Sequence, residues 1–196
     1  MEGEYDPIEI IKNSYKYLQQ TIEEARNILS QNAPKELLSD LDSLLKYMNN
    51  KTISNNNNYY SNYVKKASGL DKKDQIIIYM FDNYFMAGIV RGISEYAKKL
   101  DPNDSDYKER VNNIKGFIQR DLTDRTIFNV IYAGFLKKAF EQLKSKEKKS
   151  LKNYNDILQK ISNDLMNTVE NLLEYRIKNR EQFYNSLSEI NKLVYK

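Results

Sequence analysis

The stretch that most constrains the fold runs from Ile76 to Ala97 and reads IIIYMFDNYFMAGIVRGISEYA. Most of its residues are apolar or aromatic, and they do not keep to one stripe, which is typical of a helix buried inside a bundle. Asp82, Asn83 and Arg91 interrupt it, whereas a membrane span needs about 20 predominantly apolar residues. We therefore expect the central helix of a soluble all-α protein, with no contact to a membrane.

The composition narrows the class of protein further. A chain of 196 residues suits a single domain, and its three prolines and six glycines favour long helices. The absence of cysteine excludes disulfides and thiolate chemistry, and the absence of histidine removes the usual metal ligand and general base. The sequence contains no nucleophile elbow, P-loop or metal signature. We expect a protein that is not an enzyme and has no cofactor and no metal.

Residues 1–49 predict an N-terminal helical hairpin. Asp6 is a good N-cap and Pro7 suits the first helical position. Apolar residues then follow heptad spacing from Ile8 to Leu29, which predicts one stripe against the core, with a coiled-coil partner surface as the alternative. Pro34 starts a second helix with an apolar face from Leu37 to Met48. The short connection between the two indicates an antiparallel pair.

Residues 50–70 predict an exposed loop rich in Asn and Tyr. Seven of the fifteen residues in positions 49–63 are Asn, a residue that favours turns over helices. Tyr59, Tyr60 and Tyr63 lie at the end of this run. We expect them to dock the loop onto the domain; the alternative is that they stack on bases.

Residues 71–143 are expected to supply the core helices, with helices at 72–100 and 124–143 in the middle. Gly88 and Gly92 lie four residues apart on the first of these, with Tyr84 and Tyr96 on the same face. Small residues at this spacing let a neighbouring helix approach closely. A Pro- and Asp-containing break follows at residues 100–105, and Thr123 is the predicted N-cap of the helix at 124–143.

Residues 144–196 are predicted to form a basic turn and a long C-terminal helix. Apolar positions recur with helical spacing from Leu151 to Val194, and a bend near residues 178–180 would let this segment fold back. No strand is predicted. The whole chain therefore predicts one helical bundle of six to seven helices, spanning residues 1–196.

Two polar clusters have structural explanations. Asp101, Asp104 and Asp106 have the spacing of a calcium loop, but the central Gly and the closing Glu are missing, so we predict a helix-capping loop. A second cluster, around the start of the helix at 124–143, mixes both signs of charge. It predicts capping and ion pairs, with a grip on phosphate or on another subunit as the alternative; its members are Arg120, Asp121, Asp124 and Arg125.

The strongest functional feature is a basic run. Residues 144–196 hold a net charge of +4, which equals that of the whole chain, and residues 144–152 contain five lysines. Such a run would hold nucleic acid by displacing counterions from phosphates, although a solvated turn, or lysines that complement a helix dipole, would also explain it. The predicted nucleic-acid-binding residues are Lys137, Lys138, Lys144, Lys146, Lys148, Lys149, Lys152, Arg120 and Arg125.

Three parts of the chain together resemble a known family. They are the basic stretch Tyr63-Val64-Lys65-Lys66-Ala67, the apolar helix from Tyr84 to Tyr96, and a final helix with Tyr154, Leu158, Leu172, Leu173 and Arg176. In this order they resemble the small helical subunit of type III CRISPR effector complexes. The chain departs from that family at residues 82–84, where Asp-Asn-Tyr replaces Asn-Gly-Leu, and it has no Trp. The resemblance implies a non-catalytic RNA-binding scaffold that contacts its own copies and larger subunits of an antiviral complex.

The composition supports a second hypothesis. High Ile, Lys, Tyr and Asn without Cys, His or Trp is also typical of thermophilic archaea and their viruses. The alternative function is therefore that of an archaeal-virus structural protein, or of an inhibitor that acts on the host by protein–protein contact. The acidic start MEGEYDPIEII has no positive region followed by an apolar run, so we expect a cytoplasmic protein.

Overall fold

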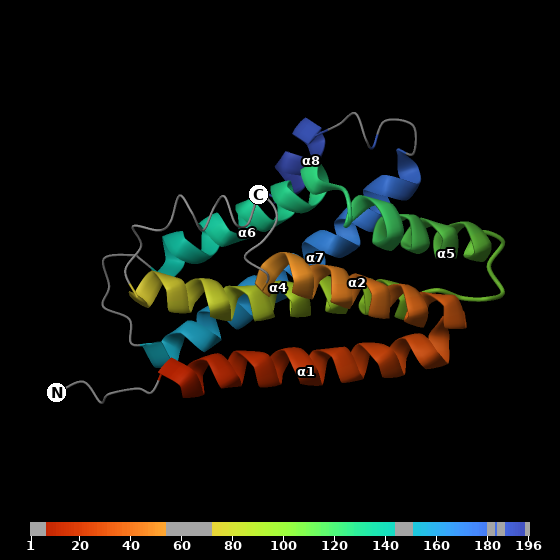
Figure 1. The fold of residues 1–196 in the computed structure, drawn as a ribbon. Coiled ribbons are helices and arrows are strands. Elements are labelled where there is room, and N and C mark those ends of the chain that lie inside the picture. Colours follow the sequence, from red (N-terminus) through yellow and green to blue (C-terminus); the bar gives the residue numbers. More distant parts are fainter. Residues whose placement is uncertain (1–6, 54–71, 144–150, 180–182, 184–186, 195–196) are drawn as a thin grey trace.

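The computed structural model of the protein describes residues 7–53, 72–143, 151–179, 183 and 187–194. These residues form seven α-helices and one short π-helix, with no strand among them, which confirms the all-α prediction (Figure 1). The elements are α1 (Pro7–Asn32), α2 (Lys35–Ile53), α4 (Lys72–Lys98), α5 (Tyr107–Gly116), η1 (Phe117–Asp121), α6 (Arg125–Leu143), α7 (Leu151–Lys178) and α8 (Leu187–Val194). The predicted docking of Tyr59, Tyr60 and Tyr63 lies outside the described residues.

Helix α4 lies at the centre of the bundle, as its composition predicts. It packs along most of its length against α1 on one side and α7 on the other. Most of its apolar residues are buried, including Phe81, Phe85, Ile89 and Ile93. By length and composition alone α4 could cross a membrane, but 78% of its most apolar window is buried inside the protein. The helix therefore forms the core, as expected for a soluble protein.

The order of the contacts shows that α1, α4 and α7 run in the same direction. Ser14 of α1 accepts a hydrogen bond from Asn83, and Tyr17 accepts one from Arg91. Contacts between α4 and α7 advance together in the same way, because Tyr84 bonds Asn155 and Tyr96 bonds Glu174. Helices α2, α5 and α6 return in the opposite direction (Figure 1). The antiparallel pairing of α1 with α2 is thus confirmed.

The close approach predicted at Gly88 and Gly92 occurs between α4 and α7. A Cβ atom placed on Gly88 would lie 2.8 Å from Leu165 Cδ2 and 2.9 Å from the Ser162 carbonyl oxygen. On Gly92 it would lie 2.5 Å from Val169 Cβ. The backbone of α7 crosses directly over the two glycines and leaves no room for a side chain at either position. This contact between the helices therefore depends on the small size of glycine.

The start of α6 corrects one prediction. Thr123 does not cap the helix, because its Oγ1 donates hydrogen bonds to the carbonyl oxygens of Gln119 and Arg120 in the preceding turn. Asp124 lies at the N-cap instead, where its Oδ1 accepts a 3.4 Å hydrogen bond from the N–H of Ile127. The π-helical turn η1 shifts the register by one residue, since the wider turn pairs Leu122 N–H with the Phe117 carbonyl.

The C-terminal region bends where the sequence indicates. Helix α7 ends at Lys178, and the separate helix α8 packs against α6 and α7. The long helix is therefore α7, and the chain continues beyond it into α8. Phe183, Ile190 and Val194 are fully buried. Folding back thus lets the last apolar residues cover the outer face of α6, which would otherwise be exposed.

Candidate functional site

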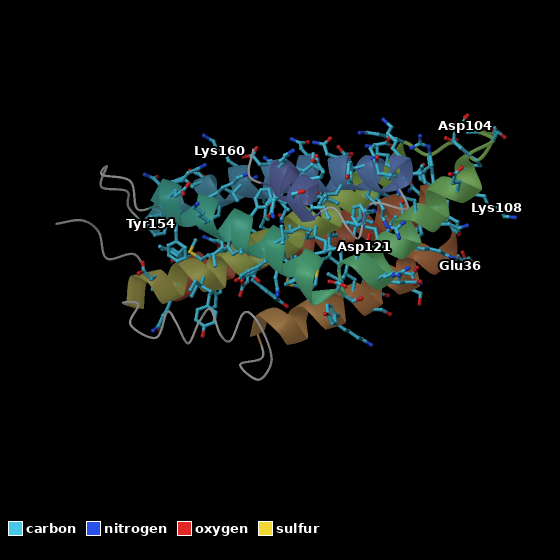
Figure 2. The ribbon with its side chains drawn as sticks, turned by 90° about the horizontal axis from the view of Figure 1, so that it is seen from above. Glu36, Asp104, Lys108, Asp121, Tyr154 and Lys160 are labelled. Atoms are coloured by element: carbon cyan, nitrogen blue, oxygen red, sulfur yellow. The ribbon has the colours of Figure 1, made fainter. Side chains whose placement is uncertain are left out.

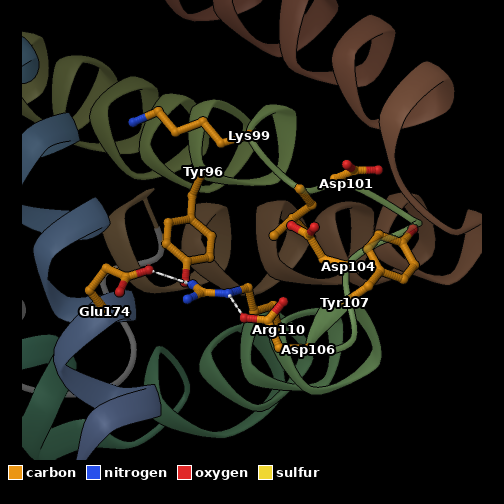
Figure 3. Close-up of a pocket in the computed structure, with 9 residues that line it drawn as sticks. Tyr96, Lys99, Asp101, Asp104, Asp106, Tyr107, Arg110 and Glu174 are labelled. Atoms are coloured by element: carbon orange, nitrogen blue, oxygen red, sulfur yellow. Dashed lines mark hydrogen bonds and ion pairs between the residues drawn. The ribbon is translucent and has the colours of Figure 1, made fainter.

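The pocket of interest lies at the end of the bundle where α4 stops and α5 begins (Figure 3). Its volume is about 250 Å³, and it is open to solvent on one side. Four carboxylates and two cations line it, together with two tyrosines and one leucine: Asp101, Asp104, Asp106, Glu174, Lys99, Arg110, Tyr96, Tyr107 and Leu100. The lining therefore has an excess of negative charge.

A single arginine organises the inner wall of this pocket. Arg110 of α5 reaches back to Asp106, with Nε 2.7 Å from Oδ2, and across to Glu174 of α7, with Nη1 2.6 Å from Oε1. The same Nη1 donates to the hydroxyl of Tyr96 on α4, which in turn donates to Glu174 over 2.6 Å. Four side chains from α4, α5, α7 and the loop before α5 are thereby tied together (Figure 3).

The protonation states in this cluster follow from their neighbours. Partial burial works to raise the pKa of the Glu174 carboxyl, but hydrogen bonds from Tyr96 and Arg110, together with the charges of Arg110 and Lys178, outweigh it and hold that pKa below its ordinary value. Burial, and the bond to Glu174, raise the pKa of the Tyr96 hydroxyl. At physiological pH Glu174 therefore stays charged, and the hydroxyl of Tyr96 stays protonated and remains a hydrogen-bond donor.

The outer wall of the pocket is formed by aspartates of the loop before α5. Asp101 and Asp104 are exposed, and neither forms an ion pair with another described residue. Asp101 Oδ1 accepts a hydrogen bond from the N–H of Asn103, which closes a turn. The predicted helix-capping role is wrong for Asp106, which lies at the N-cap of α5 but makes no capping hydrogen bond with its side chain, because its carboxylate binds Arg110 instead. Among the described residues no group of three or more metal-binding side chains is close enough to hold an ion.

The structure also locates part of the predicted nucleic-acid-binding set. Lys137 is exposed, 4.0 Å from Glu141, and the ammonium of the half-buried Lys138 lies 4.4 Å from the centre of the Phe135 ring. Burial lowers the pKa of Lys138, while the charge of Asp164 works the other way. Lys152 lies in the first turn of α7. Lys144, Lys146, Lys148 and Lys149 lie outside the described residues.

The two arginines of that set lie elsewhere. Arg120 is exposed at the end of η1, and Arg125 is the first residue of α6. Lys137 follows Arg125 by twelve residues on the same helix, so about 18 Å separates them along the axis. Arg125 and Lys137 therefore occupy distant positions on α6.

A buried ion pair was missed by the sequence analysis. Arg176 of α7 binds Asp121 of η1, with Nε 2.6 Å from Oδ2, and Asp121 is completely buried. The guanidinium also bonds both the carbonyl and side-chain oxygens of Asn113. It passes over Gly116, where any Cβ atom would collide with it. Asp121 therefore belongs to the interior, and Arg176 is a structural residue.

Four of the residues of α7 that carry the family resemblance are buried in the core, namely Tyr154, Leu158, Leu172 and Leu173. Their apolar character is explained by helix packing, so they do not test the resemblance. No family model matches the chain, and searches of curated proteins and of solved structures also find no match.

Proposed function

We propose that the protein is a non-enzymatic helical interaction module that binds the backbone of nucleic acid, and that this nucleic acid is RNA. The interface we propose is the lysine end, defined as the end of α6 with Lys137 and Lys138, the start of α7 with Lys152, and the lysines between them in the sequence. The family resemblance would make the protein a scaffold subunit of a cytoplasmic antiviral ribonucleoprotein complex that contacts its own copies or larger subunits.

The separation of charge along the molecule carries this proposal. Tyr154, near the start of α7, and Asp104, at the mouth of the acidic pocket, lie at opposite ends of the bundle (Figure 2). Residues 144–152, which connect α6 to the first turn of α7, hold five lysines and a single acid. A phosphate backbone would be attracted to the lysine end and repelled from the pocket end. This polarity favours one orientation of the protein on the strand.

A second candidate function is recognition of a protein partner, as expected for a viral structural or host-interacting protein. Two tyrosines support it, because Tyr15 and Tyr79 expose 54% and 57% of their surface. Among the described residues no other large hydrophobic side chain is so exposed. Tyrosine is enriched in protein interfaces because it combines a large apolar ring with a hydroxyl.

The experiment that separates the two functions is a pull-down of the tagged protein from its native cells. Bound proteins and nuclease-sensitive material are identified in the same sample. A short RNA together with larger subunits of one complex would support the RNA-scaffold function. A single host enzyme or virion proteins, without RNA, would contradict it and favour the protein-partner function.

A further inference from the structure

Three arginines among the described residues are partly buried, and they differ in their partners. Arg110 and Arg176 each bind a carboxylate at 2.6–2.7 Å. Arg91, in the middle of α4, forms no ion pair with any described residue. A partly desolvated guanidinium without a counter-charge is unfavourable, and arginine in such a position commonly meets an anion.

The side chain of Arg91 is nevertheless held in a defined position. Its Nη1 donates one hydrogen bond to the hydroxyl of Tyr17 on α1, over 2.9 Å, and another to Oδ1 of Asn163 on α7. Both acceptors are neutral. Because Nη1 is bound from two sides, the guanidinium is fixed where α1, α4 and α7 meet, and an incoming ligand would not have to order it.

The remaining edge of this guanidinium carries donors without acceptors. Nε and Nη2 of Arg91 make no hydrogen bond to any described residue. These two nitrogens form the planar fork that binds the paired oxygens of a phosphate or carboxylate in bidentate geometry. Glu95, one turn further along α4, is the nearest acidic residue in sequence, and it too forms no ion pair with a described residue.

We propose that Arg91 is an oxyanion-binding residue that takes a phosphate group on its Nε–Nη2 edge, while Tyr17 and Asn163 position it. The site is separate from the lysine end and does not depend on the nucleic-acid function. The phosphate can belong to a small phosphorylated molecule or to a nucleic-acid backbone, and the recognition chemistry is the same for both.

The test follows the Nε–H signals of the seven arginines by NMR during titration of the full chain with inorganic phosphate, at constant ionic strength. We expect the Arg91 signal to shift and saturate with a dissociation constant of about 1–10 mM. The exposed Arg26, which is paired with Asp42, is the internal control and should not shift. An unchanged Arg91 signal, or equal unsaturable shifts in all arginines, would overturn the proposal.

Two variants sharpen this test. Arg91→Lys keeps the charge but loses the fork, so saturable binding should disappear, as read by the phosphate-dependent rise in melting temperature. Glu95→Gln removes a nearby negative charge and should tighten phosphate binding about two- to five-fold. Affinity that is unchanged in both variants would contradict the assignment to Arg91.

A second titration, with a dinucleotide that contains one phosphodiester, identifies the source of the phosphate. Tighter binding of the dinucleotide than of inorganic phosphate at Arg91 assigns the site to a nucleic-acid backbone; weaker or equal binding of the dinucleotide assigns it to a small phosphorylated molecule. Replacing the four lysines at 144, 146, 148 and 149 should leave the Arg91 shift intact. That variant separates a failure of this site from a failure of the lysine end.

Discussion

Helix α7 meets the rest of the protein in two contrasting regions. At Gly88 and Gly92 of α4 its backbone approaches closely, and the contact at these two points is made of apolar side chains and carbonyl groups. Against η1, the contact is the buried pair of Arg176 and Asp121. The first region depends on the absence of side chains and the second on a match of opposite charges. One helix is thus positioned by close packing at the glycines and by an ion pair at η1.

The largest effect is expected in the charged region. Arg176→Met should reduce the free energy of unfolding by about 3–5 kcal/mol, because the buried carboxylate of Asp121 loses its ion pair with Arg176. Urea unfolding followed by circular dichroism measures this loss. The double variant Arg176→Met/Asp121→Leu should recover much of it, since a buried pair can often be replaced by apolar residues. A loss below about 1 kcal/mol in the single variant would show that the pair is dispensable.

A smaller effect is expected in the glycine region. Gly92→Leu should cost about 1–3 kcal/mol by overpacking, because even its Cβ atom would meet Val169 Cβ at 2.5 Å. Thermal unfolding measures the change, and Gly88→Leu should behave in the same way. The compensating change Val169→Ala, combined with Gly92→Ala, should restore part of the loss relative to Gly92→Ala alone. Unchanged unfolding of Gly92→Leu would mean that α7 does not cross α4 closely.

The smallest effect concerns the partly exposed charge cluster at the pocket. The pKa of Glu174 is lowered in the folded protein, so its contribution to stability is present above its ordinary pKa of 4.5 and is lost as the pH falls through the folded value. We expect the free energy of unfolding of wild type to exceed that of Glu174→Gln by less than about 1 kcal/mol at pH 7. Urea unfolding between about pH 7 and pH 3 should show this difference vanish. A difference that grows in acid would reverse the assigned sign.

The glycine region could be predicted from the sequence because its signal is local. Gly88 and Gly92 lie four residues apart on one helix, and periodicity alone places them on one face. The identity of α4 as the core helix followed from the same kind of signal. The partner helix was not predicted, since no local pattern encodes which helix will cross.

The charged regions could not be predicted for the opposite reason. Arg176 and Asp121 are 55 residues apart, and Arg110 and Glu174 are 64 apart. In the sequence each looks like an ordinary surface charge. The error at Thr123 has a related cause, because the π-helical turn shifts the start of α6 to place Asp124 at the cap and Asp121 against Arg176. Only the folded chain brings these partners together.

The most direct test of the proposed function is the salt dependence of RNA binding. Fluorescence anisotropy of a labelled single-stranded RNA is measured from about 50 to 200 mM salt, a range over which backbone contacts weaken strongly. Wild type should show a steep slope of log affinity against log salt. Replacing Lys144, Lys146, Lys148 and Lys149 with Ala should flatten the slope by up to about 3, whereas Arg120→Ala should change it by less than about 1. An identical slope in wild type and the four-lysine variant would contradict the assignment of RNA binding to the lysine end.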